Sequence, residues 1–314
     1  MKQFLKKIAI FSLLVGLLIL AAEHIITKGL KSSQVSLTGS WNQLFSGRIQ
    51  ADVLINGSSK AYSNISPLII DSVLLCNSYN LGINGNNFLS QYYKYQAYLA
   101  HNVAPKLVIQ IVGNSCLKES AGLYNLYQFL PYIEQPPIKK LLQHYQYLDF
   151  FDYHFPFKRY FGEKKAIEEG FLNYFLLTDT LQDKLYKGSY LADKSWDNSF
   201  ERFIKHTPNG REIVQDQYLR QLMEQFLREQ QQAAIQTVLV YAPTYQPSHA
   251  YIKNRAAIIN YYSTLAEKYQ VPFLNYSNLA LTKNKELFFN SQHLNKKGAQ
   301  LFSRILAKDL KHYL

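Results

Sequence analysis

The sequence has few of the residues that build metal or cofactor sites. Among its 314 residues there are two cysteines, Cys76 and Cys116, and neither stands at metal-ligand spacing. There is also no glycine-rich loop of the kind that cradles phosphates. We therefore expect no metal and no nucleotide cofactor. We interpret both cysteines as small buried side chains, because their segments would lie on strands separated by a third, too far apart for a disulfide.

Acidic residues are also scarce relative to basic ones. The chain has 22 Asp and Glu against 34 Lys and Arg, a formal net charge of +12. Such an excess suits nucleic acid, an anionic membrane face or an anionic polymer as a neighbour. The basic residues are scattered, and no zinc-finger, basic-zipper or RNP-type motif accompanies them. We expect no nucleic-acid partner and favour a solvated basic surface facing anionic lipid or glycan.

One long hydrophobic run is present, at the amino end. Three lysines in MKQFLKK precede an uncharged apolar stretch from Ile8 to Ala22. Its length lies between a signal-peptide core and a full membrane span. Cleavage after Ala21 or Ala22 would put a large residue where a small one is wanted, so we favour a retained signal-anchor over residues 1–27. Lysines before the span predict a cytoplasmic amino end and an extracytoplasmic remainder, in the periplasm or on the outer face.

After a polar tether expected over residues 28–50, short apolar strands alternate with amphipathic segments. The expected strands are 51–56, 72–80, 106–112, 237–243 and 271–277. The expected helices are a short piece at 67–71 and longer ones at 88–101, 213–232, 249–269 and 295–312. Parallel strands need helix-sized crossovers, so this alternation predicts an α/β fold, a three-layer α/β/α domain over residues 51–314. Ligands of such sheets bind beyond the carboxyl ends of the strands.

Residues 115–212 interrupt the alternation. They are dense in Tyr, Phe, His and Lys, as in HYQYLDFFDYHFPFKRYFGEKK. We expect a largely helical insertion over the active face. It could act as a lid, as a wall on which glycans stack or as a membrane-facing surface, or it could pack as an ordinary part of the core.

Two polar segments carry the chemistry. NGSS follows the first strand, so Ser59 stands at the ligand edge of the sheet, where a hydroxyl can act as a nucleophile. Far along the chain, NSQHLNKKGAQLF places His293 just before the last helix. An imidazole near the strand edge supplies the base that a serine nucleophile needs.

Three blocks, in order, resemble the SGNH (GDSL-like) hydrolase superfamily. NGSS is similar to its G-[DS]-S block, NSYNLGINGNN to N-x-G-x-[SN]-G, and NSQHLNKKGAQLF to D-x-x-H-L-[NS]-x-x-G. The chain resembles in particular the membrane-anchored, envelope-directed branch, which includes the alginate O-acetyltransferase-like proteins and the D-alanyl-lipoteichoic-acid biosynthesis protein. The resemblance implies a flavodoxin-like sheet, Ser59 as nucleophile, His293 as base, and an oxyanion hole that includes Gly85 and the Ser59 N–H.

Two positions depart from that pattern. Asn290 stands where the family carries an aspartate, and in serine proteases the corresponding Asp→Asn change lowers turnover roughly 10⁴-fold. Activity would then rest on a Ser–His dyad oriented by Asn290 or on a carboxylate from elsewhere such as Glu286, or it would be absent. Asn114 lies one place early for the family's G-x-N-D block, so it either donates to the oxyanion or caps its loop.

These observations favour a membrane-anchored esterase or O-acyltransferase that acts on acyl esters of cell-envelope glycans. Its expected partners are the membrane, through the N-terminal helix, and an envelope polysaccharide or acyl donor protein. The rival interpretation is an inactive relative that serves as a binding or assembly subunit for polysaccharide biosynthesis or export. The departures at Asn290 and Asn114 are what favour the rival.

Overall fold

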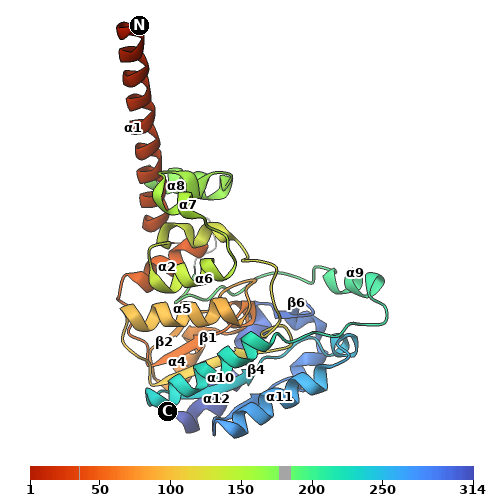
Figure 1. Cartoon of the computed structure of the whole chain (residues 1–314). Coiled ribbons are helices and arrows are strands. Elements are labelled where there is room, and N and C mark those ends of the chain that lie inside the picture. Colours follow the sequence, from red (N-terminus) through yellow and green to blue (C-terminus); the bar gives the residue numbers. More distant parts are fainter. Residues whose placement is uncertain (35, 177–184) are drawn as a thin grey trace. The chain divides into compact units, whose positions relative to one another are not determined.

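The computed structural model describes residues 1–34, 36–176 and 185–314 and divides the chain into two compact units (Figure 1). We call Met1–Ser46 with Asn125–Lys184 the anchor unit, and Gly47–Tyr124 with Leu185–Leu314 the sheet unit. The expected insertion is thus shared between them. Its ends, 115–124 and 185–212, belong to the sheet unit, and its middle belongs to the anchor unit.

A five-stranded parallel sheet forms the centre of the sheet unit. The strands are β1 Val53–Asn56, β2 Ser78–Asn80, β3 Leu107–Val112, β4 Gln236–Tyr241 and β5 Phe273–Asn275. Their order is β2-β1-β3-β4-β5, with every neighbouring pair parallel. The α/β prediction with a parallel sheet is confirmed. Because the chain passes from β1 to β2 on one side and then to β3 on the other, a switch point lies beside β1, where such sheets bind ligands.

Helices cover both faces of this sheet. They are α3 Ser59–Asn64, α4 Pro67–Leu74, α5 Phe88–His101, α10 Gln217–Gln232, α11 Arg255–Lys268 and α12 Lys296–Leu310. The sheet unit also contains α9 Ser199–His206, which projects away from the sheet (Figure 1). Ile109 and Ile111 share one core with Phe302 of α12. The alternate residue Gln110 donates instead to Gln91 of α5, which places α5 on the opposite face. The predicted three-layer arrangement is therefore present.

The anchor unit is helical. Its elements are α1 Lys2–Ser32, α2 Ser36–Phe45, α6 Pro136–His144, α7 Phe150–His154 and α8 Lys164–Tyr174, with 3₁₀ turns at Leu126–Gln128, Leu130–Tyr132 and Lys158–Tyr160. α1 crosses α8 at two glycines: a Cβ on Gly29 would lie 1.7 Å from the Gly170 carbonyl oxygen. Among the described residues, α1 is the helix long and apolar enough to cross a membrane.

Some sequence expectations were wrong in detail. Residues 72–80 are not one strand: α4 continues to Leu74, Leu75 caps it with φ +53°, and β2 begins only at Ser78. A short apolar run cannot by itself distinguish a buried helix from a strand. The polar segment expected as an irregular tether contains α2. Both cysteines are free, Cys116 buried and Cys76 partly buried.

Candidate active site

Ser59 lies where β1 gives way to α3. Gly57 makes this tight turn possible, because a Cβ there would lie 2.8 Å from the Cβ atoms of both Ala61 and Ile111. Ser59 is the first residue of α3, and the first N–H groups of a helix have no acceptor within the helix. The turn therefore presents a hydroxyl and a backbone N–H at the carboxyl edge of the sheet.

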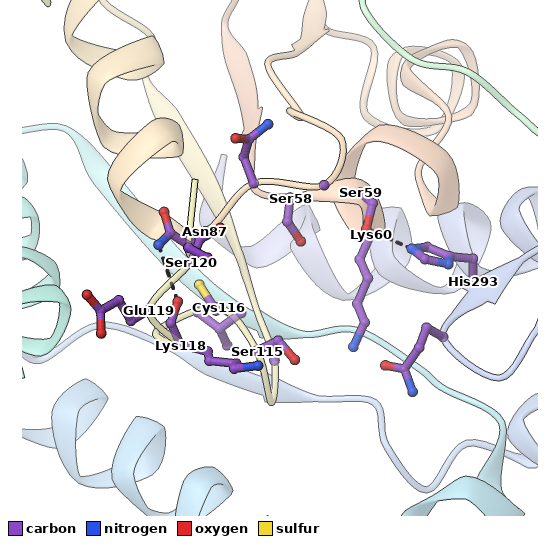
Figure 2. A pocket seen from close by; sticks show the side chains of 16 residues that line it. Ser58, Ser59, Lys60, Asn87, Ser115, Cys116, Lys118, Glu119, Ser120 and His293 are labelled. Carbon is purple, nitrogen blue, oxygen red and sulfur yellow. Dashed lines mark hydrogen bonds between the residues drawn. The ribbon is translucent and has the colours of Figure 1, made fainter. Parts of the chain in front are cut away.

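His293 reaches Ser59 from a short hairpin near the C-terminus. The hairpin pairs β6 (Phe288–Asn290) with β7 (His293–Leu294). Leu294 N–H donates to Asn64 Oδ1 at 3.0 Å, which ties β7 to the end of α3. His293 Nε2 lies 2.7 Å from Ser59 Oγ (Figure 2). The fold thus brings together the two predicted side chains, although 234 positions separate them.

Asn290 fixes the tautomer of His293. Its Oδ1 lies 2.9 Å from His293 Nδ1 and also accepts the backbone N–H groups of Gln292 and His293, each at 3.0 Å. Two backbone donors require an oxygen at this position, so the orientation of the amide is not arbitrary. An amide oxygen only accepts, so Nδ1 carries the proton and Nε2 is left to accept from the Ser59 hydroxyl. This is the tautomer that a general base needs.

A carboxylate stands behind Asn290, and it is Asp197, not Glu286. The Asp197 backbone N–H donates to Phe289 O at 2.9 Å, beside Asn290 in the hairpin, and the Asp197 carboxylate interacts electrostatically with the Asn290 side chain. Burial raises the pKa of Asp197, but the interactions with Ser199 and Asn290 outweigh it and lower the pKa overall. Asp197 is therefore an anion near Asn290, and its negative charge acts on His293.

The surroundings of His293 favour its neutral form. Burial, and after it the positive charge of Lys60, lower the pKa of His293 to about 4, while the charge of Asp197 acts in the opposite direction. The imidazole ring stacks on Phe289, with centroids 5.3 Å apart and planes at 8°. His293 is thus an unprotonated, oriented base at neutral pH.

A cavity of about 400 Å³ opens beside Ser59 and His293, and Gly85 lines it as well. Gly85 has φ +71°, and a Cβ there would lie 2.4 Å from Tyr124 Cγ, so the position requires glycine. Ile83 N–H donates to Gly57 O at 2.9 Å, which holds this loop against the turn that carries Ser59. Ser59 and Gly85 therefore border one space.

Asn114 is not part of that cavity lining. Its Oδ1 accepts from the Tyr241 hydroxyl, and the residue lines a second cavity of about 220 Å³ with Arg211 and Ser248. The structure thus brings four of the five predicted site residues together, namely Ser59, Gly85, Asn290 and His293, and sets Asn114 apart.

Sequence reasoning missed two residues of this site. Asp197 lies within the expected insertion, and nothing in KSWDNSF marks it. Lys60 directly follows Ser59 and lines the same cavity, but only its burial gives it significance. Among the described residues, no group of three or more His, Cys, Asp or Glu is placed to hold a metal ion.

Comparison with known proteins finds only weak structural similarity. No family model matches the chain, and no curated protein matches it. Among solved structures, it is similar to a candidate lipolytic protein of the G-D-S-L family from Desulfitobacterium hafniense, with 12% identity, a TM-score of 0.41, and 82% of this chain and 99% of that chain covered. It is also similar to the aryl esterase of M. smegmatis, with 11% identity, a TM-score of 0.37, and 84% and 100% covered. At these values the likeness supports no assignment of activity.

Proposed function

We propose that this chain is an SGNH-type serine esterase or O-acyltransferase. Ser59 Oγ attacks the carbonyl carbon of an ester while His293 Nε2 takes its proton. The Ser59 and Gly85 N–H groups stabilise the oxyanion. His293 then protonates the departing alcohol and leaves an acyl-enzyme on Ser59. Water or a sugar hydroxyl, deprotonated by the same imidazole, attacks the acyl group and restores the serine.

The observation that carries this proposal is the chain of contacts from Asn290 through His293 to Ser59. Its distances of 2.9 Å and 2.7 Å are those of hydrogen bonds, and its tautomer is the one required for proton transfer. The adjoining cavity has room for an acyl group and part of an acceptor.

The test is covalent labelling of the full chain with a fluorophosphonate probe, together with hydrolysis of p-nitrophenyl acetate. We expect labelling and turnover in the wild type and neither in Ser59→Ala. Ser58→Ala is the matched control, because Ser58 lines the same cavity but makes no hydrogen bond to His293 among those described. Equal labelling of Ser59→Ala and the wild type would refute the proposal.

A second candidate function is binding without catalysis, in the assembly or export of envelope polysaccharide. One observation favours it: the direct partner of His293 Nδ1 is the uncharged Asn290. A neutral amide orients imidazole but stabilises the imidazolium less than a carboxylate does. Absence of both labelling and turnover, with measurable glycan binding, would favour this candidate.

We further propose that α1 anchors the protein and that its substrate is an acyl ester of an envelope glycan. The apolar side chains of α1 from Phe4 to Leu20 are largely exposed, whereas Ile26 and Leu30 are buried in the anchor unit. The three lysines before the apolar stretch favour a cytoplasmic amino end and an extracytoplasmic remainder. An anchored enzyme at that surface would meet envelope glycans, and the net charge of +12 suits anionic ones.

Exposed phenylalanines of the anchor unit support this membrane position. We call Phe150, Phe151, Phe155, Phe161, Phe171 and Phe175 the aromatic collar; each is between 47% and 79% exposed. The loop within the collar is fixed to α1 where the apolar stretch ends, since Glu23 pairs with Arg159 and accepts from Phe157 N–H. Aromatic rings beside the end of a span would sit at the depth of the lipid headgroups.

A further inference from the structure

Lys60 is a buried lysine without an acidic partner. The residue is 8% exposed, and it lines the cavity beside Ser59 and His293. Within the described part of the chain, no carboxylate lies within 4.0 Å of its ammonium. Its ring contact is with Tyr241, whose centroid lies 6.0 Å from Nζ. Burial accordingly lowers the pKa of Lys60 to about 8, which still leaves it mostly charged at neutral pH.

A second basic group, Arg255, lies beside the same tyrosine. The Arg255 guanidinium also lies 6.0 Å from the Tyr241 centroid. Its Nε and Nη2 are buried and have no hydrogen-bond partner among the residues that the structure describes. Burial, Arg255 and Lys60 together lower the pKa of His249 to about 4. Burying positive charge is costly unless an anion pairs with it. This part of the molecule is therefore preorganised for an anion that none of the described residues supplies.

The ammonium lies apart from the proposed oxyanion hole. Gly85 follows β2, on one side of β1, whereas the Lys60 side chain extends to the other side. Its Nζ lies 3.0 Å from where a Cβ on Gly113, at the end of β3, would be. In Figure 2 it runs away from the Ser59–His293 hydrogen bond toward Ser115. Its position suits a second charged group of a substrate better than the oxyanion.

We propose that the ester substrate carries an anionic group, a carboxylate or a phosphate, that binds Lys60 on the β3 side of Ser59. This inference rests on the proposed function and specifies its substrate class. Ser115 and Gln292 also line this cavity and offer hydroxyl and amide donors to the same group. Glu119 lines it too, but it is exposed at the surface and makes no ion pair with Lys60.

The kinetic test compares p-nitrophenyl esters that differ in charge. Butyrate is the neutral ester, and hemisuccinate and phosphonoacetate are the carboxylate and phosphonate esters. We expect the wild type to prefer one of the anionic esters in kcat/KM by about tenfold or more, as for one charge-assisted hydrogen bond. Lys60→Met should abolish this preference. Lys106→Met should keep the preference for the anionic ester. Lys106 is exposed, lies just before β3 at the amino ends of the strands, and pairs there with Asp52.

The results separate this inference from the proposed function. If Ser59 is labelled but no anionic ester is preferred, or if Lys60→Met keeps the preference, the anion site is refuted and the esterase stands. If no ester is hydrolysed, the anion site is tested by anion binding, measured as a shift in Tm. Succinate or methylphosphonate should then raise the Tm of the wild type above its value in chloride of equal ionic strength, and not that of Lys60→Met. If the Tm of the wild type is the same in these anions as in chloride, the proposed anion site is refuted, and no variant is needed for that conclusion.

Discussion

Exchanging the side chains of Asn290 and Asp197 would move a negative charge next to His293 while keeping one amide and one carboxylate at these two positions. In the double variant Asn290→Asp/Asp197→Asn, the carboxylate at position 290 still accepts from Nδ1 and from the two backbone N–H groups that Asn290 Oδ1 accepts now. The new amide at 197 can donate to its other oxygen. Asn290→Asp alone is less informative, because two carboxylates in contact would force one to bind a proton.

The expected gain follows from the distances. A carboxylate at position 290 would lie about 4 Å from the imidazolium charge, where an effective dielectric constant of about 20 gives about 4 kcal/mol. Asp197 acts across one further amide, at roughly 7 Å, which gives about 2 kcal/mol. The difference of about 2 kcal/mol corresponds to about 30-fold in kcat/KM. Because Asp197 is exposed, water weakens its present stabilisation of the imidazolium, so the gain in kcat/KM should be at least this large.

The assay is kcat/KM for p-nitrophenyl acetate as a function of pH. The exchange should raise kcat/KM and also move its acidic limb to higher pH, because an adjacent carboxylate raises the pKa of His293. Asp197→Asn alone should lower kcat/KM, since it removes the negative charge that acts on His293. If Ser59 of the double variant is still labelled but its kcat/KM does not exceed that of the wild type, the distance of the negative charge from His293 does not limit the reaction.

Three further predictions concern the base, the oxyanion hole and the membrane. Burial lowers the pKa of His293 to about 4, so the neutral base persists as pH falls until about that value; an acidic limb of kcat/KM near the ordinary histidine pKa would contradict the geometry. Gly85→Ala should lower kcat about 100-fold with little change in KM, since its Cβ would displace the loop from Tyr124; wild-type kcat would exclude Gly85 from the oxyanion hole. In vesicles of brominated lipid, Phe161→Trp fluorescence should be quenched more than that of Lys31→Trp, because position 31 lies about 14 Å beyond the end of the apolar stretch along α1; equal quenching would argue against an interfacial collar.

Local patterns in the sequence determined the elements that depend on near neighbours. The helix expected over 88–101 is α5, with the same bounds, because its apolar periodicity is complete. The asparagine expected to cap the last helix does so, with Asn295 Oδ1 accepting from Gly298 N–H at 3.1 Å. The asparagine before α5 makes no such cap bond, although the helix begins there. Periodicity and turn residues act over a few positions, so they can be read from the chain.

The pairing of Ser59 with His293 was also predictable in part. In a parallel sheet, residues that follow the strands meet at one edge, so a serine after β1 and a histidine before the last helix were expected to approach each other. Their separation of 2.7 Å depends on more than this rule. It requires the hairpin of β6 and β7 and the bond from Leu294 to Asn64, neither of which has a distinctive local pattern.

The charges around the site were decided by tertiary structure alone. Asp197 reaches Asn290 because its backbone pairs with Phe289, and such long-range pairing leaves no periodic trace in the sequence. Lys60 is an ordinary helical lysine in the sequence, and only the packing of β3 and β4 around it removes water from its ammonium, which pairs with no carboxylate in the described part of the chain. The sequence by itself specified which groups could react. Burial and distance, which exist only in the folded chain, decided how their charges are balanced.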